Sequence, residues 1–289
     1  MSLIGTMGSG VSALRTFMKG LEVIGNNIAN VNTTGFKGST AKYSDSFSNI
    51  LVQSSSNGTT TTPAVAVGTG VTLSGVTTNY TQGALSSTGK STDLGISGNG
   101  FFRVKNPNSG EEFVSRAGDF RWDEQGYLVT NDGYRVQGLT GYNAGPPVVP
   151  ATTVGDIQLS TSTDIQSVSI DRSGAIIESY SDGSTAVTGQ VLLQNFKDPA
   201  ALVKQGNNLY SGMDAAGPTN GSVALLNDGT NDPGANGLGY IQSGTLELSN
   251  VDLTEQFSEL ITTQRSFQAG SRLLTVSDSV LEDIVNLKR

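Results

Sequence analysis

Carboxylates are the only side chains in this sequence that could support familiar acid–base catalysis. The 289 residues include no His and no Cys, which excludes imidazole bases, thiolate nucleophiles, disulfides and ordinary zinc sites. Paired carboxylates could still form a glycosidase site. Five lie close together in one glycine-punctuated segment: Glu111, Glu112, Asp119, Asp123 and Glu124. Each is in or beside a turn signal, where acidic residues commonly act as solvated turn formers. We therefore predict that the chain is not an enzyme, and keep a carboxylate-based cell-wall glycosidase as a remote alternative.

Three further motifs match ligand-binding patterns only in part. The letters GSGVSA, residues 8–13, fit a dinucleotide fingerprint, but only seven residues precede them, too few for the required strand. GALSSTGKS, residues 83–91, has five residues between its glycines where a phosphate-binding loop has four. NDGTNDPGAN, residues 227–236, lacks the spacing and terminal Glu of a helix–loop–helix calcium site. We expect no cofactor and no metal.

Charge and hydropathy exclude two classes of partner. Seventeen basic and 25 acidic residues give a net charge of −8, the wrong sign for neutralising phosphates, so no nucleic-acid partner is expected. No apolar run exceeds four residues, so membrane insertion is not expected. The first cationic side chain is Arg15, which argues against a secretory signal peptide. If the protein is exported, we expect an export pathway that does not recognise a secretory signal peptide.

The N-terminal residues predict a long amphipathic helix. Apolar residues recur mostly in alternating steps of three and four, a coiled-coil-like seam about 45 Å long at 1.5 Å per residue. The seam residues are Leu3, Met7, Val11, Leu14, Met18, Leu21, Ile24, Ile28 and Val31. Glycines within the same span each weaken a helix by about 1 kcal/mol relative to Ala. The isolated helix should therefore be marginal.

An Asn-rich segment follows this helix directly. Asn and Gly adopt left-handed cap conformations readily, and Asn side chains compete for backbone hydrogen bonds. We interpret the segment as the C-terminal stop of the helix and as a candidate assembly motif. Its residues are Asn26, Asn27, Asn30, Asn32, Gly35 and Phe36.

The C-terminal residues predict a second long helix. Asp252 and Glu255 form a D-x-x-E start, and the helix is expected to end near Leu287. Large apolar residues recur every seven positions. The residues four positions after them complete the seam, and about half of these are polar or small. The seam residues are Leu253, Phe257, Leu260, Gln264, Phe267, Ser271, Leu274, Leu281 and Val285.

Neither helix is expected to bury its seam alone. A large apolar side chain contributes about 1.5–3 kcal/mol on burial, whereas fixing each backbone residue costs about 1–2 kcal/mol before hydrogen bonds are credited. The two helices are natural partners, but two narrow seams with polar gaps leave surface uncovered. We infer that further copies of the chain cover that surface.

Between the helices, the sequence predicts an all-β middle domain, so the fold class is α+β. From residue 71 the apolar period changes to two, and Gly-containing turn signals interrupt it. The expected organisation is a terminal helical polymerisation domain (1–50 and 245–289), an extended connector (51–70), a Gly-rich antiparallel β domain (71–140 and 165–244), and a Pro-rich linker or vestigial outer-domain insertion site (141–164). A soluble β-sheet binding module with incidental helices is the competing interpretation.

Three long motifs resemble the rod and hook family of bacterial flagellar axial proteins. Residues 23–51, VIGNNIANVNTTGFKGSTAKYSDSFSNIL, are similar to the N-terminal signature of that family. Residues 80–104, YTQGALSSTGKSTDLGISGNGFFRV, are similar to an internal segment, and residues 243–289 to the C-terminal helix. Within the family, SDSFSNIL and the ending VNLKR resemble hook proteins most and distal rod proteins second. The short stretch after Gly138 departs from most hook proteins.

The resemblance implies a structural subunit of the flagellar hook, with a distal rod subunit as the alternative. Such a subunit would self-associate into a flexible helical tube that transmits torque and encloses the export channel. It would contact rod, hook-cap and hook–filament junction proteins, in the extracellular hook or the basal body, after type III export without a cleaved signal peptide. The Asn and Thr side chains of residues 26–34 would then pair with backbone and neighbouring-subunit groups.

Overall fold

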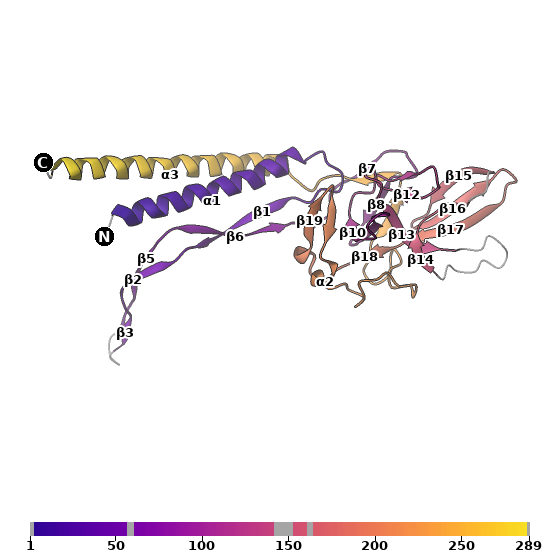
Figure 1. Ribbon diagram of the computed structural model, residues 1–289, viewed down its shortest axis with the longest axis horizontal. Helices are drawn as coiled ribbons and strands as arrows, with labels where there is room; N and C mark the ends of the chain where they lie inside the picture. The colour runs from indigo at the N-terminus through magenta and orange to yellow at the C-terminus, as the bar shows by residue number, and fades with distance from the viewer. Residues whose placement is uncertain (1–2, 57–60, 142–152, 161–163, 288–289) are drawn as a thin grey trace. The chain divides into compact units, whose positions relative to one another are not determined.

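The computed structural model describes residues 3–56, 61–141, 153–160 and 164–287. The chain forms two compact units (Figure 1). The helical unit comprises Met1–Ala29, Gly38–Asn79 and Val251–Arg289, and the β unit comprises Asn30–Lys37 and Tyr80–Asn250. Terminal helices together with a β-rich middle of antiparallel sheets confirm the α+β prediction.

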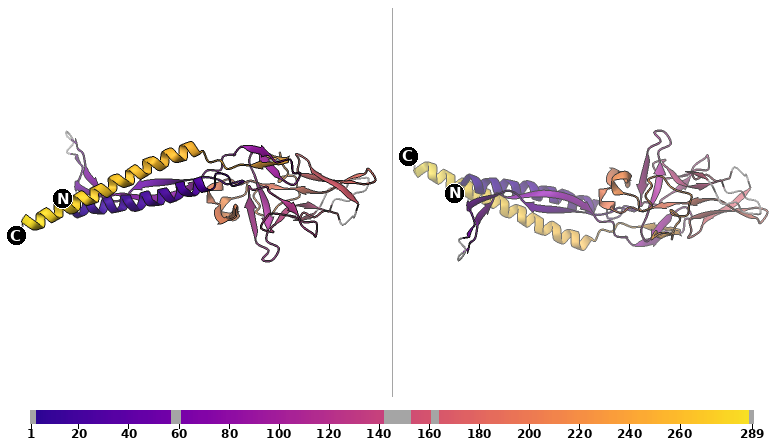
Figure 2. Two further views of the ribbon diagram at one scale, coloured as in Figure 1. Left: turned by 90° about the horizontal axis from the view of Figure 1, so that it is seen from above. Right: turned by 90° about the horizontal axis from the view of Figure 1, so that it is seen from below.

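Two helices and a two-stranded ribbon make up the helical unit. Helix α1 (Leu3–Ala29) lies beside helix α3 (Leu253–Leu287) in each view (Figures 1 and 2). The ribbon consists of three successive antiparallel pairs: β1 (Ser39–Asp45) with β6 (Val71–Thr78), β2 (Ser48–Val52) with β5 (Val65–Gly68), and β3 (Ser55–Ser56) with β4 (Thr61–Thr62).

Glycines allow α1 and α3 to approach closely. A Cβ atom on Gly270 would lie 3.2 Å from Leu14 Cδ2, and one on Gly10 would lie 3.3 Å from Leu274 Cδ2. Each helix thus places a leucine over a glycine of the other. This reciprocal packing offsets the low helix propensity that made glycines look unfavourable in the sequence.

The ribbon packs on α1 through contacts that include one aromatic pair and hydrogen bonds to Val71. The rings of Phe17 and Tyr43 meet edge to face with centroids 6.2 Å apart. The Thr16 hydroxyl donates to the Val71 carbonyl at 3.1 Å, and the Val71 N–H donates to Ser12 Oγ at 3.4 Å. The ribbon therefore belongs to the same compact unit as the helices.

The predicted start of the C-terminal helix is confirmed. The Asp252 carboxylate accepts hydrogen bonds from the backbone N–H groups of Thr254 (2.7 Å) and Glu255 (3.4 Å). Backbone N–H groups in the first turn of a helix have no partner within the helix, and an N-cap side chain such as Asp252 supplies one. The predicted end of this helix near Leu287 also agrees with α3.

The unit boundaries differ from the expected domain boundaries. Residues 71–79 lie in the helical unit because β6 pairs with β1. Residues 30–37 and 245–250 lie in the β unit, where the Gly35 N–H donates to the Glu247 carbonyl at 2.8 Å. The expected connector 51–70 contributes strands to the ribbon, because Ser- and Thr-rich chain can form backbone pairs without burying a core.

The β unit is built around an antiparallel 12-stranded sheet. Its main path runs in the order β15–β16–β17–β13–β9–β10–β20–β19, while β12 and β14 pair with β13, β11 with β12, and β18 with β9. The strands are β9 (Phe101–Lys105), β10 (Glu112–Ser115), β11 (Arg121–Trp122), β12 (Leu128–Val129), β13 (Arg135–Thr140), β14 (Thr153–Asp156), β15 (Ile165–Ile170), β16 (Ala175–Tyr180), β17 (Thr185–Val191), β18 (Leu193–Gln194), β19 (Val203–Gly206) and β20 (Leu209–Ser211).

Two further pairs and two short helical segments complete the β unit. The pairs are β7 (Leu85–Ser87) with β22 (Thr245–Glu247) and β8 (Leu94–Ser97) with β21 (Tyr240–Ser243). The helical segments are η1 (Pro199–Ala201) and α2 (Met213–Ala216). Of the segment expected as a linker, 141–164, residues 142–152 and 161–163 lie outside the described residues, and β14 pairs with β13.

The core of the β unit lies under the central strands. Phe102 and Phe120 meet edge to face, with ring centroids 5.1 Å apart. Trp122, the only Trp of the sequence, is half-buried and packs against this cluster. None of the described helices has the length and hydropathy needed to cross a membrane.

Candidate functional site

The predicted N-terminal seam is only partly covered within one chain. Ile24 is buried, and Met7, Leu14, Leu21, Ile28 and Val31 are half-buried. Val11 and Met18 are exposed, and the Leu3 side chain lies outside what the structure describes. The α1 surface that carries Val11 and Met18 is therefore only partly covered by the described residues of this chain.

The predicted C-terminal seam is divided in the same way. Leu260, Phe267, Leu274 and Leu281 are half-buried, whereas Leu253, Phe257, Gln264, Ser271 and Val285 are exposed. The residues of α3 that are fully buried are Gln256, Thr263 and Gly270, again seven apart. Sequence reasoning missed these three because it followed apolar residues, although their regular spacing was visible.

Asn27 of the Asn-rich segment connects three elements of the helical unit. Its side chain is 2% exposed. Its Nδ2 donates to the Ser39 carbonyl at 2.7 Å and to Gln256 Oε1 at 2.9 Å, and its Oδ1 accepts from the Ser39 N–H at 3.0 Å. The end of α1, the start of β1 and the first turns of α3 thus share one carboxamide.

The rest of the Asn-rich segment forms a turn in the β unit. Asn30 begins it, accepting from the Thr33 N–H and hydroxyl at 3.1 Å each. Asn208 Nδ2 donates to the Thr34 carbonyl at 2.8 Å. Gly35 has a φ of +66°, and a Cβ there would lie 2.5 Å from the Ala117 nitrogen. Only glycine suits that position, for both reasons.

Phe36 and Asn32 have different places in this turn. Phe36 is buried, and the Lys204 ammonium lies 4.8 Å from its ring centroid. The same ammonium donates to the Lys37 carbonyl at 2.8 Å. Asn32 is exposed, and Asn26, which precedes the turn on α1, is also exposed.

A buried ion triad of Lys37, Arg116 and Glu247 holds this turn. Lys37 Nζ lies 2.7 Å from Glu247 Oε1, and Arg116 Nη1 lies 3.2 Å from Glu247 Oε2. The three side chains are between 0% and 4% exposed. The Gly83 N–H also donates to Glu247 Oε1 at 2.8 Å. The carboxylate is thus fully paired in a dry site.

The triad carries two positive charges against one negative charge. Burial lowers the pKa of Lys37, and the Glu247 carboxylate opposes that shift. Burial also lowers the pKa of Arg116, again opposed by Glu247. The Arg116 guanidinium lies 5.2 Å from the centroid of the Phe101 ring, and its Nε has no hydrogen-bond partner among the residues that the structure describes. Glu247 is therefore the group on which both buried cations depend.

The triad lies in the β unit, and two of its residues, Lys37 and Glu247, are close in sequence to the unit boundaries. The chain passes between its two units after residues 29, 37, 79 and 250. Lys37 Nζ donates to the Thr81 carbonyl at 2.8 Å, and Asn250 Nδ2 donates to the same oxygen at 3.1 Å. Within the β unit, one hydrogen-bond network therefore fixes residues next to three of the four passages. Sequence reasoning missed it, because a lone Lys, Arg and Glu far apart in sequence give no signal.

The five carboxylates first considered for catalysis have separate surroundings. Glu112 forms an ion pair with Arg103. The Asn131 side chain donates a hydrogen bond to the Asp119 carboxylate. Burial raises the pKa of Asp119. Asp123 accepts from the Glu124 N–H at 2.8 Å, and Glu111 accepts from the Ser109 hydroxyl at 3.3 Å. Among the described residues, no group of three or more His, Cys, Asp or Glu side chains could hold a metal ion.

Replacing Asn27 with Ala should loosen the helical unit. The change removes three hydrogen bonds from a buried site, a loss of about 1–3 kcal/mol. Amide hydrogen exchange in residues 38–45 and 253–263 should accelerate accordingly. The control is Asn286→Ala at an exposed position of α3, which makes a similar change in helix propensity. Equal exchange in the two variants would contradict the role given to Asn27.

Replacing Glu247 with Gln should destabilise the β unit by about 3–5 kcal/mol, because two buried cations lose their only carboxylate. Urea unfolding followed by Trp122 fluorescence reports on this unit. The control Glu111→Gln changes an exposed carboxylate and should shift stability by less than about 0.5 kcal/mol. A loss below about 1 kcal/mol for Glu247→Gln would show that the triad does not hold the turn.

Comparison with known proteins identifies the family. Residues 7–37 match the model of the flagella basal body rod protein, residues 95–178 that of the flagellar hook protein FlgE/F/G D1 domain, and residues 242–287 that of the flagellar basal body rod FlgEFG protein C-terminal. The family matches include the Asn-rich segment, all three residues of the ion triad, and all of α3.

Similarity extends along the whole chain. The flagellar basal-body rod protein FlgG of Bacillus subtilis is 38% identical over 99% of this chain and 100% of its own length. FlgG of Agrobacterium fabrum is 32% identical over 97% of this chain and 97% of its own length. The flagellar hook protein FlgE of Salmonella typhimurium is 24% identical over 96% of this chain and 98% of its own length. A solved structure of Helicobacter pylori hook protein FlgE2 covers 30% of this chain and 26% of its own with a TM-score of 0.22, too low for a comparison of folds.

The family consists of structural components of the flagellar axis that assemble with other flagellar proteins, and it is not known as a family of enzymes. This chain belongs to the FlgE/F/G family of flagellar rod and hook proteins, which are structural components of the basal body or the hook.

Proposed function

We propose that this chain is a subunit of the distal rod of the flagellar basal body and that it polymerises through its helical unit into a tube. The observation that carries the proposal is an uncovered apolar stripe on α3. Its residues are Leu273, Val276, Val280, Ile284 and Leu287, each between 39% and 86% exposed. Steps of three and four place them on one face of the helix.

This stripe is separate from the surface of α3 that packs on α1. The half-buried residues Phe267, Leu274 and Leu281 lie seven apart, on the face of α3 where Leu274 packs on Gly10 of α1. Leu273 and Val280 directly precede the last two of these, so they point about 100° away from the α1 contact. A helix with two separate apolar faces is typically packed between two neighbouring elements.

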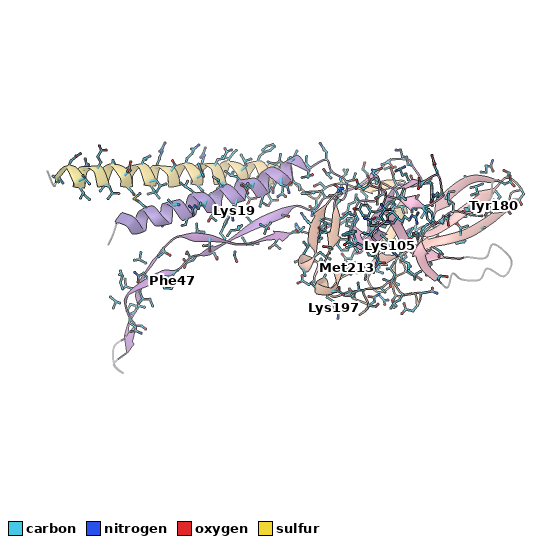
Figure 3. All side chains as sticks on the ribbon, in the orientation of Figure 1. Lys19, Phe47, Lys105, Tyr180, Lys197 and Met213 are labelled. Atoms are coloured by element: carbon cyan, nitrogen blue, oxygen red, sulfur yellow. The ribbon has the colours of Figure 1, made fainter. Side chains whose placement is uncertain are left out.

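The ribbon provides a second uncovered apolar surface. Phe47, labelled in Figure 3, is 74% exposed. Ile50, Leu51, Val52 and Val65 are about half or more exposed. A two-stranded ribbon is marginal in water unless another surface packs on it. Exposed apolar patches of this extent mark association surfaces in soluble proteins.

Further copies of this chain are the proposed cover. Residues 1–47 hold four basic and two acidic side chains, a charge of +2, whereas residues 246–289 hold four basic and seven acidic ones, a charge of −3. Opposite charges at different ends favour contacts between unlike surfaces of successive copies, although exposed pairs contribute little individually. Unlike surfaces joined repeatedly without closing generate a helical polymer.

The rod is favoured over the hook by similarity along the full chain. The relatives of about a third identity or more carry the rod name, whereas the hook relative is 24% identical. The alignment with the hook protein spans 422 positions, more than the 289 residues of this chain, so that protein contains segments that this chain lacks. The hook preference drawn from SDSFSNIL and VNLKR relied on two short segments, which weigh less.

The remaining parts of the proposal follow from a place in the rod. The predicted seams of α1 and α3 would meet those of neighbouring copies, and polar seam positions such as Gln264 and Ser271 would limit the penalty of small shifts. The subunit would be exported by the flagellar type III apparatus and would contact the adjoining axial proteins.

Deleting the gene should remove the distal rod together with every structure beyond it. Electron microscopy of isolated basal bodies tests this, because a rod subunit and a hook subunit leave different remnants. Basal bodies with a full-length rod that lack only the hook would instead favour the hook assignment.

In the same strain, complementation with Val276→Asp and Val280→Asp combined should fail to restore the rod, because two carboxylates would be buried in the proposed contact. The control combines Thr275→Asp with Ser279→Asp, which adds the same charge to exposed polar positions next to the stripe. Immunoblots establish equal amounts of both proteins. Normal rods from the stripe variant would contradict the proposal.

A further inference from the structure

We infer that the β unit contains a binding pocket for a neutral oligosaccharide, a function separate from assembly. The pocket has a volume of about 420 Å³, within the range of about 300–1,000 Å³ that ligand sites occupy. Four asparagines, two threonines and one leucine line it. All seven lie in loops and turns, and none belongs to a strand.

Asn231 makes the pocket wall rigid. Its side chain is 2% exposed, and its Nδ2 donates to the Leu193 carbonyl at 2.9 Å. Its Oδ1 accepts from Asn220 Nδ2 at 3.0 Å and from the Leu226 N–H at 3.1 Å. The sequence of this region, rich in Gly, Asn and Asp, suggests a solvated surface excursion. The structure instead attaches it to β18 through a fully used carboxamide.

Other polar groups of the pocket remain available to a ligand. Asn195 Oδ1 accepts from the Phe196 N–H at 2.9 Å, and Asn236 Nδ2 donates to the Thr230 carbonyl at 3.3 Å. Within the described part of the chain, no hydrogen bond engages the side-chain Nδ2 of Asn195, the side-chain Oδ1 of Asn236 or the hydroxyl of Thr219. The pocket therefore offers a donor, an acceptor, and one group that can act as either.

These groups select the class of ligand. No charged side chain lines the pocket, so a charged ligand would be desolvated without a counter-ion. Asp228 and Asp232 of the same loop further disfavour an anion. An apolar ligand would leave the carboxamides unpaired. Sugar hydroxyls donate and accept at once, and buried Leu238 offers apolar contact to the C–H groups of a ring.

A peptide is the competing ligand, because backbone amides also pair with carboxamides. Extended peptides usually add to an exposed strand edge, and this pocket has none among its lining residues. The observations therefore favour the saccharide.

Binding is tested on the purified, unassembled full-length chain by calorimetry and saturation-transfer NMR. The probes are maltotriose, cellotriose and tri-N-acetylchitotriose, with a neutral Gly-Ser peptide as the competing arm. We expect saturable binding of at least one saccharide with a Kd of about 1 mM or below. Combining Asn195→Leu with Asn236→Leu should weaken it about tenfold or more, because two hydrogen bonds are lost.

Two further variants make the result decisive. Asn108→Leu changes an exposed asparagine in a turn outside the pocket and should leave the affinity unchanged. Thr219→Val removes only the hydroxyl and should weaken binding about threefold even if the double variant unfolds. Trp122 fluorescence establishes folding. No saturable saccharide binding, binding that none of the pocket variants weakens, or binding of the peptide alone would overturn the inference, whatever the outcome for rod assembly.

Discussion

The packing of α1 on α3 is the contact on which the helical unit depends. Leu14 and Leu274 each lie over a glycine of the opposite helix, so the helices approach closely on one face. That contact covers one side of α3 and leaves the stripe that begins at Leu273 in water. Because helix stability in proteins comes mainly from packing of apolar faces, any surface that packed on this stripe would stabilise α3 further, and we propose that other copies of the chain provide it.

Buried polar side chains stabilise each unit close in sequence to the unit boundaries. Asn27 joins α1, β1 and α3 through three hydrogen bonds. A few residues later, Lys37 enters a buried triad with Arg116 and Glu247. Such a triad contributes little net stability, but removing one member leaves buried charge uncompensated. In a rod, it would keep the connecting segments anchored in the β unit while torque passes through them.

Local patterns in the sequence predict the long elements well. Alternating steps of three and four predict α1, and the Asp252 cap predicts the start of α3, because both signals are local. The ribbon is missed because strands 48–52 and 65–68 are held by backbone pairing while most of their apolar side chains stay exposed, so no buried face marks them in the sequence. The ion triad is missed because its members are 79 and 131 residues apart. Gln256 and Thr263 are missed because polar residues rarely indicate a buried helix face.

The central claim is that α3 acquires its full cover only in the assembled tube. The most direct test is amide hydrogen exchange of residues 273–287, compared between the dilute monomeric chain and the polymer. This account predicts fast exchange in the monomer and strong protection in the polymer, confined mainly to the helical unit. Equal, high protection of these amides in the dilute monomer would contradict it.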